Sequence, residues 1–279
     1  MWSVIVRNEA RKLIARRRTW AGFATYLLFE GLVLLLLALP KTQHEFDRLL
    51  TKNGIAFDAV YSGLTLATYM LLLTMTLVGG VGLALVATDL VAKEIEDGTL
   101  RLTLARPISR LQLLVGKAVV GAVYTLLFVL FAGATAALVA AAYTGRLADL
   151  LVFAPTHGVF AFHEGADALW RYGRALLLLA LAMQTVTALG FMFSCLRLKP
   201  VTAAGLTLMV LLVDGVLWAA PFLGPYRHYF LTHHLGCWLW TFEYVVPWTS
   251  VAQSLIFLCG TAATFWVVGA TAFLARDLR

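Results

Sequence analysis

Six long apolar runs constrain this chain more than any other feature of its sequence. A helix needs about 20 predominantly apolar residues to cross the hydrocarbon core of a bilayer, and each run reaches that length. With their flanking residues, we expect spans at about 20–39, 61–92, 113–143, 174–196, 201–223 and 250–275. Hydrophobic residues make up 61% of the chain and charged residues 13%, against roughly 25% charged in soluble domains. The sequence predicts an all-α polytopic membrane protein, with residues 1–279 forming a single transmembrane domain.

The six spans and their connections occupy the whole chain. No stretch remains that is long and polar enough for a soluble catalytic domain. A phosphate-binding GxxxxGK[ST] loop is also missing, because Gly116-Lys117 is followed by Ala118 and has no glycine five positions earlier. We therefore expect a protein that is not an enzyme and that binds no cofactor or metal of its own.

The positions of Lys and Arg predict the orientation. With both termini placed in the cytoplasm, 15 of the 22 basic residues lie on the inner side, as the positive-inside rule requires. The net charge of +7 then reflects contact with anionic lipid head groups and does not indicate nucleic-acid binding. The expected location is the cytoplasmic (inner) membrane.

Residues 1–18 precede the first span and are rich in basic residues. Trp2, Val6, Ala10, Leu13 and Ile14 recur at helical spacing, and most of the Lys and Arg residues lie on the opposite face. This pattern is typical of an amphipathic helix in the membrane interface. The alternative is a basic anchor that only fixes the topology.

The connection between the second and third spans is the most polar segment inside the chain. It runs from an acidic cluster through Gly98 to a proline and then to Lys117. We expect Gly98 to close a helix in the left-handed conformation and Thr99 to cap a short helix that ends before Pro107. Ser109 and Gln112 have the spacing of a capping box for the third span. The predicted product is a rigid, charged connector.

This segment resembles the loop between the second and third helices of ABC-2 type transporter permeases, the membrane subunits of ABC exporters also called type V. The resemblance implies that residues 98–107 form a coupling helix seated in a cleft of a separate ATPase subunit. It also implies that ATP and Mg²⁺ are bound by that ATPase, and that two copies of the permease assemble as a homodimer. We assign ATPase coupling to Glu94, Glu96, Gly98, Thr99, Leu100, Leu104, Arg106, Pro107, Ser109, Arg110 and Lys117. An export function across the inner membrane follows, with the substrate left open.

Residues 222–250 form the largest outer segment and combine many aromatic residues with Gly and Pro. Such a mixture suits short helices at head-group level. ABC-2 permeases have short re-entrant helices in the corresponding loop, whereas the plainer interpretation is an aromatic belt that anchors helix ends. The outer loops are too short to hold a binding domain, so any extracytoplasmic accessory partner would be a separate protein.

All six histidines fall on the predicted outer side. His228, His233 and His234 are loosely similar to one histidine box of the di-iron membrane desaturases, but those enzymes have several boxes on the cytoplasmic face. A metal-binding or pH-sensing site built from these three residues is a second hypothesis. Packing at the interface is the third.

Two acidic residues, Glu30 and Asp214, lie inside predicted spans. A carboxylate in lipid costs several kcal/mol unless it is paired, protonated or in contact with water. Both are therefore candidates for a polar path or for contacts across a dimer interface. A proton-coupled secondary transporter built around these acids is the alternative function, although no convincing internal repeat of the kind found in such carriers is visible.

Overall fold

Six helices of the protein are long and apolar enough to cross a membrane. The computed structural model describes residues 2–52, 62–100, 109–147 and 149–275. The spans are α2 (Arg17–Leu37), α5 to α6 (Gly63–Asp89), α9 (Arg110–Thr144), α10 (Gly165–Cys195), α11 (Pro200–Ala219) and α13 (Trp248–Leu274). The second span contains a π-helical turn, η1 (Met75–Gly79), between α5 (Gly63–Thr74) and α6 (Gly80–Asp89). The predicted all-α polytopic fold is confirmed.

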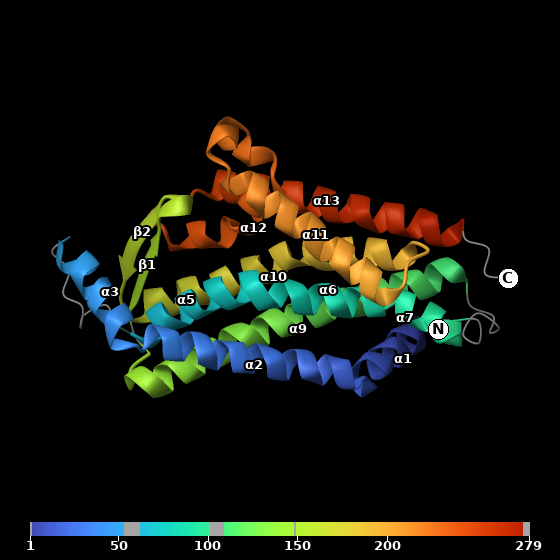
Figure 1. The fold of residues 1–279 in the computed structure, drawn as a ribbon, viewed down its shortest axis with the longest axis horizontal. Helices are drawn as coiled ribbons and strands as arrows, with labels where there is room; N and C mark the ends of the chain where they lie inside the picture. The colour runs from blue at the N-terminus through green and yellow to red at the C-terminus, as the bar shows by residue number, and fades with distance from the viewer. Residues whose placement is uncertain (1, 53–61, 101–108, 148, 276–279) are drawn as a thin grey trace.

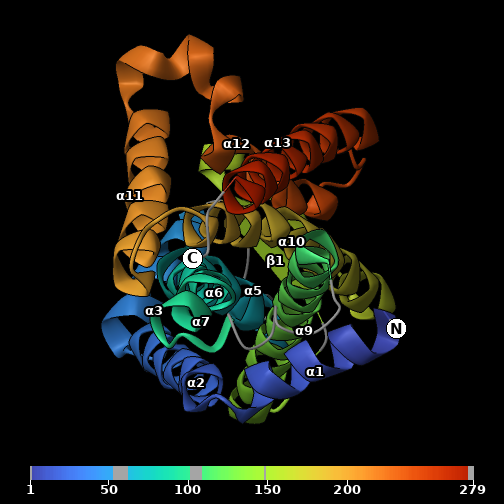
Figure 2. The same cartoon turned by 90° about the vertical axis from the view of Figure 1, so that its right-hand side faces the viewer.

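The spans run alongside one another and differ strongly in how far the chain covers them (Figure 1). In the most apolar window of α10, 61% of the residues are buried, and in that of α5 to α6 the share is 53%. The same share is only 17% for α2, 17% for α11 and 11% for α13. Viewed along the bundle, α10, α6 and α9 lie at the centre and α2, α11 and α13 lie at the periphery (Figure 2).

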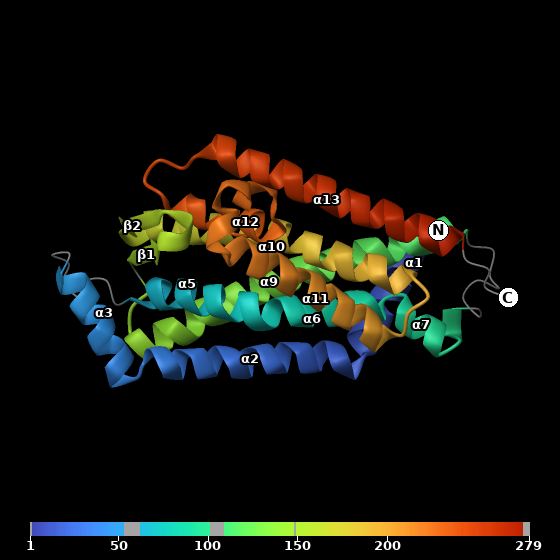
Figure 3. The ribbon, with the colours of Figure 1, turned by 45° about the horizontal axis from the view of Figure 1, so that its top comes forward.

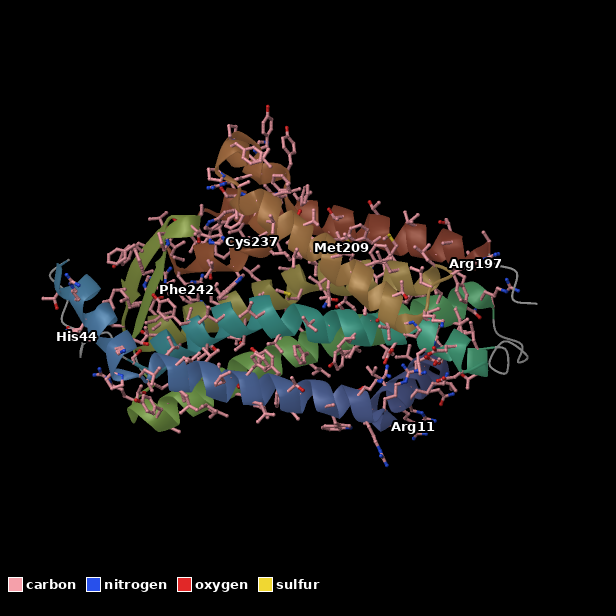
Figure 4. All side chains as sticks on the ribbon, viewed as in Figure 1. Arg11, His44, Arg197, Met209, Cys237 and Phe242 are labelled. Atoms are coloured by element: carbon pink, nitrogen blue, oxygen red, sulfur yellow. The ribbon has the colours of Figure 1, made fainter. Side chains whose placement is uncertain are left out.

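One end of the bundle, called the α1 end here, gathers the N-terminal helix, the end of the second span and the start of the third. Helix α1 (Trp2–Ala15) crosses the start of α9, and α7 (Ala92–Glu96) lies nearby (Figure 2). Arg11 and Arg197 project at this end, whereas His44, on α3 (Pro40–Lys52), lies at the opposite end (Figure 4).

The opposite end, called the hairpin end, contains an antiparallel β-hairpin that the sequence analysis did not anticipate. Strand β1 (Leu150–Ala154) pairs with β2 (Val159–His163) across the turn η2 (Pro155–His157), in the register Leu150 to His163. The strand β1 is fastened to α5, because Leu151 N donates to Thr65 Oγ1 at 2.9 Å and Phe153 N donates to Tyr69 Oη at 3.1 Å. These two donors would otherwise be unpaired on an edge strand.

The aromatic segment after α11 folds into three short helices, of which the last lies next to the hairpin and α13 (Figure 3). They are η3 (Pro221–Tyr229), α12 (Leu231–Leu235) and η4 (Cys237–Phe242). The first has no buried residue, whereas Cys237, Trp238 and Phe242 of η4 are buried. One part of this segment therefore belongs to the core and another part stands clear of the bundle.

Local chemistry fixes several helix ends. Ser62 Oγ accepts from Thr65 N at the start of α5, and Pro200 stands in the first turn of α11, where its missing N–H is no loss. Gly145 ends α9 with a positive φ of 71°. A Cβ added at Gly63 would lie 2.7 Å from the carbonyl oxygen of Arg146, so only glycine lets α5 meet α9 this closely.

Candidate functional site

The buried Glu94 of α7 is the centre of the polar connector. Only 3% of the residue is exposed. Its Oε2 lies 2.7 Å from Lys117 Nζ, and its Oε1 lies 3.3 Å from Lys12 Nζ and 3.4 Å from Arg16 Nη2. One carboxylate on α7 thus contacts cations from three other places in the chain.

Lys117 is buried in the second turn of α9 and bridges two carboxylates. Its side chain is 2% exposed, and its ammonium group lies 2.6 Å from Glu9 Oε2 as well as 2.7 Å from Glu94. Glu9 also pairs with Lys12 at 2.7 Å. We call Glu9, Lys12, Arg16, Glu94 and Lys117 the ion cluster.

The charges of the ion cluster sustain one another. Burial raises the pKa of Glu9, but Lys117 and Lys12 outweigh it and hold the pKa below its usual value. Burial likewise lowers the pKa of Lys12, and the pairs with Glu9 and Glu94 more than compensate, so its pKa is raised. Three cations therefore face two carboxylates. The cations and the carboxylates are needed together, because an uncompensated buried charge is strongly destabilising.

The ion cluster joins α1, α7 and α9, and neighbouring contacts extend it. Arg16 Nη1 donates to the carbonyl oxygen of Asp89 at 2.8 Å, and Arg18 pairs with the Asp89 carboxylate at 3.3 Å. A Cβ added at Gly116 would lie 2.8 Å from Ile5 Cγ2, so glycine allows α1 to lie directly on α9. The start of α2 and the end of α6 are thereby fixed to the same cluster.

The connector begins with the expected left-handed residue, whereas the predicted cap at Thr99 depends on residues outside those described. Gly98 has a φ of 70°, which confirms the predicted left-handed closure after α7. The hydroxyl of Thr99 donates to the carbonyl oxygen of Glu94 at 3.3 Å, and Leu100 is 2% exposed. The expected helix at 98–107 lies mostly outside the described residues, which leave out Leu104, Arg106 and Pro107.

The far side of the connector carries the predicted cap. Ser109 Oγ accepts from Gln112 N, and the Gln112 side chain accepts from Ser109 N, so the capping box is confirmed. Arg110 is exposed in the first turn of α9. On α7, Glu96 is exposed and pairs with Lys93 at 2.8 Å, so it faces away from the buried Glu94.

Asp214 has a structural role at the other end of the bundle. Its Oδ1 accepts from Leu231 N at 3.0 Å, and its Oδ2 accepts from Thr232 N at 2.6 Å and from Thr232 Oγ1 at 2.7 Å. An aspartate that accepts from the first N–H groups of a helix is a capping residue. The carboxylate fastens α12 to α11, so its hydrogen-bonding capacity is largely used.

The histidines of the outer segment do not converge on one point. His234 Nδ1 lies 2.9 Å from Ser254 Oγ, and its Nε2 lies 2.9 Å from the carbonyl oxygen of His228, while His233 packs against Trp240. Burial, followed by the neighbouring imidazoles, lowers the pKa of His233, and burial is the main cause that lowers the pKa of His234. Across the described ranges, no group of three His, Cys, Asp or Glu residues is arranged to hold a metal.

Glu30 has the opposite environment to Glu94. It is 1% exposed in the middle of α2. Within the described part of the chain, neither of its carboxyl oxygens has a hydrogen-bond partner. No cation of the described residues forms a salt bridge with it.

Sequence reasoning missed three members of the ion cluster: Glu9, Lys12 and Arg16. One signal was available, because Glu9 is the sole acid among the first 18 residues and interrupts a basic segment. The other was Lys117, which stands in an apolar run and requires a partner. Neither signal reveals the pairing, which joins residues 108 positions apart.

Six apolar spans, a basic first helix and a charged connector held by buried ion pairs define a polytopic membrane protein. The model of the ABC-2 family transporter proteins matches residues 3–278. The chain belongs to this family, as the resemblance of the connector indicated. A comparison with curated proteins gives no match.

Proposed function

We propose that the chain is the permease subunit of an ABC transporter and couples ATP hydrolysis on a separate nucleotide-binding subunit to export of a substrate across the cytoplasmic membrane. The ion cluster carries this proposal. Two of its members, Glu94 and Lys117, flank in the sequence the segment 98–107 that would enter the ATPase. ATP and Mg²⁺ belong to that partner subunit.

The mechanical argument starts from stiffness. A displacement imposed on the connector reaches the spans only if the connector cannot yield first. Glu94 is bound to Lys117 at 2.7 Å, and Lys117 is part of α9, so a push on α7 moves α9 directly. The same cluster includes Glu9 of α1, so α1 would move together with α7 and α9.

The assembly that fits this function has two permease copies and two ATPase subunits, with both termini in the cytoplasm. The α1 end would then face the ATPase, and the basic residues of α1 would contact anionic lipids. The apolar faces of α2 and α11, of which the chain covers little, are available to a second copy or to lipid. An extracytoplasmic accessory protein would meet the hairpin end.

The test separates docking from folding by using an exposed residue. Glu96 is exposed on α7 and outside the ion cluster, so Glu96→Lys leaves the buried contacts intact and reverses a charge on the docking face. The tagged permease is purified with its partners in mild detergent, and the eluate is assayed for a co-purifying nucleotide-binding subunit and for ATPase activity. The matched control is Glu164→Lys, which reverses an exposed charge at the hairpin end.

We expect a stoichiometric ATPase subunit with the native protein and with Glu164→Lys, and less of it with Glu96→Lys. Recovery of the permease alone, under conditions that preserve other membrane complexes, would contradict the proposal. It would favour the secondary-transporter alternative instead. One observation of the structure speaks against that alternative. Asp214, one of the two acids needed there, is occupied in capping α12.

A further inference from the structure

Glu30 lies at the depth of the hydrocarbon core. It is 13 residues after Arg17, the first residue of α2, which corresponds to about 20 Å along the helix. At that depth an ionised carboxylate needs donors or a cation, because water is not available to solvate it. The surroundings of Glu30 therefore decide which form it takes.

The hydroxyl groups near Glu30 have already given their protons to other atoms. Thr74 Oγ1 donates to the carbonyl oxygen of Met70 at 2.7 Å, so the 2.6 Å contact between Tyr26 Oη and Thr74 Oγ1 requires Tyr26 to be the donor. Tyr172 Oη donates to the carbonyl oxygen of Gly133 at 2.8 Å. Both tyrosines lie close enough to Glu30 for a coulombic interaction with its carboxyl group.

The third neighbour is Thr135 of α9, which lies beside Glu30. Its hydroxyl donates to the carbonyl oxygens of Phe131 and Ala132, at 2.9 and 3.1 Å. While it makes these bonds, Thr135 offers Glu30 only lone pairs, as the tyrosines do, and donating to a carboxylate at Glu30 would give up a bond to α9. The side chains around Glu30 thus present acceptors, which suit a neutral carboxylic acid and repel a carboxylate.

Among the residues that the structure describes, no charged group compensates Glu30 from the helices packed against α2. The sequences of α5 and η1 contain no charged residue, and neither does α9 from 118 to 144. Asp89, at the end of α6, pairs with Arg18 at the α1 end. The described charges of α1 and α3 lie beyond the two ends of α2, and those of Arg171 and Arg174 on α10 are directed to the outer segment and to Trp248.

We propose that Glu30 is a proton-binding site. The carboxyl group holds a proton while α2 is packed on α9, and it releases that proton to water when α2 moves away and the seam between the two helices is hydrated. A proton fits this site because it adds no volume and converts a carboxylate without donors into an acid among acceptors. The site goes beyond the proposed function, since it concerns proton occupancy of the permease itself.

Two further features mark the α2 seam as the place of movement. Tyr124 Oη, on α9, is also buried without a hydrogen-bond partner among the described residues, and it lies 3.7 Å from the Cβ position of Gly22 on α2. Directly after Thr74, the partner of Tyr26, the second span changes to the π-helical turn η1. Such turns mark sites of altered helix geometry and are frequent at functional sites.

The first test is infrared spectroscopy of the full chain in lipid nanodiscs at pH 7. The difference spectrum between the native protein and Glu30→Gln is expected to contain a protonated-carboxyl C=O band that shifts in D₂O. Carboxylate bands in its place would overturn the proposal. Glu30→Gln is the matched variant, because it keeps the shape and hydrogen-bonding size of the neutral acid.

The second test needs no variant and covers the case in which Glu30→Gln does not fold. The native protein is treated at pH 7 with dicyclohexylcarbodiimide, which enters membranes and reacts with protonated carboxyls, and modified peptides are measured by mass spectrometry. A glutamate in water, with a pKa of about 4.3, is protonated in only about one molecule in 500 at pH 7. Modification of Glu30 should therefore exceed that of the exposed Glu96 by about a hundredfold, and equal or lower modification would overturn the proposal. Neither readout requires an ATPase, so failure here and failure of the proposed function are distinguishable.

Discussion

Replacing Lys117 by methionine removes the charge that two buried carboxylates share and keeps most of the side-chain volume. Removing one partner of a buried ion pair costs about 3 to 5 kcal/mol, and the 2% exposure of the Lys117 side chain places it in that class. Lys12, whose side chain is 40% exposed, offsets part of the loss. We expect a loss of about 3 kcal/mol, and hence a fall in Tm of roughly 10 °C.

The loss should depend on pH in a direction that follows from the charges. In the native protein the pKa of Glu9 is held low, despite burial, by Lys117 and Lys12, so its contribution is present at neutral pH and is lost only as the pH falls through that low value. Without Lys117, burial acts with less opposition and the pKa of Glu9 rises. Acidification toward about pH 4.3, which is the pKa of a glutamate in the unfolded chain, then protonates Glu9 in the folded variant and removes its uncompensated charge. The difference in Tm between the two proteins should narrow from pH 8 to pH 5.

The assay is thermal unfolding in nanodiscs, followed by tryptophan fluorescence at several pH values. Lys199→Met is the matched control, because Lys199 is an exposed lysine before α11 and its loss should change Tm little. The triple variant in which Lys117→Met is combined with Glu9→Gln and Glu94→Gln should recover most of the loss, since it leaves no uncompensated charge. A difference in Tm that stays constant from pH 5 to 8, or a triple variant no more stable than the single one, would refute the electrostatic reasoning.

Three further outcomes are expected. Gly63→Ala should lower the free energy of unfolding by about 1 to 3 kcal/mol, because its Cβ would lie 2.7 Å from a backbone oxygen. The control Gly31→Ala, whose Cβ would have nothing within 4 Å, should leave Tm unchanged or slightly higher. Equal effects on Tm would contradict the close contact of α5 and α9. Asp214→Ala should lower the free energy of unfolding by about 1 kcal/mol, because it removes the cap of α12. It should also increase maleimide labelling of Cys237, which is buried in the native protein. Unchanged labelling would show that α12 is held by other contacts. Gly98→Ala should cost about 1 kcal/mol through its positive φ, measured as a lower Tm, and Gly98→Asn should cost less; the reverse order would exclude a left-handed residue there.

Much of the fold follows from local patterns in the sequence. The six apolar runs predict the six spans because lipid demands continuous apolar helices. The capping box at Ser109 and the left-handed Gly98 were predictable in the same way, since each depends on residues within one helical turn. The β-hairpin was missed although Pro155 and Gly158 separate two short runs that contain Val and Phe. In a chain that is apolar almost throughout, such short runs do not stand out as strands.

The candidate site was only partly accessible from the sequence. Glu94 and Lys117 were selected through the family resemblance, and the structure brings them to 2.7 Å. Glu9 was not selected, because its pairing with Lys117 depends on how α1 lies across α9, and this follows from tertiary packing such as the contact of Ile5 with Gly116. Asp214 was correctly identified as a carboxylate that needs partners, but its partners are backbone N–H groups of α12, which no side-chain pattern announces.

Glu30 and Glu94 are both buried glutamates, and under the proposed function the contrast between them separates a part that transmits force from a part that moves. Glu94 lies among three cations that belong to separate elements, so any displacement of α7 relative to α9 separates charges in a poorly solvated place and is resisted. Glu30 lies among acceptors and makes no hydrogen bond within the described residues, so separating α2 from α9 breaks none at this residue and lets water solvate it. A membrane protein that must transmit a push without yielding at one end, and open a seam farther along, requires this difference in polar satisfaction between the two places.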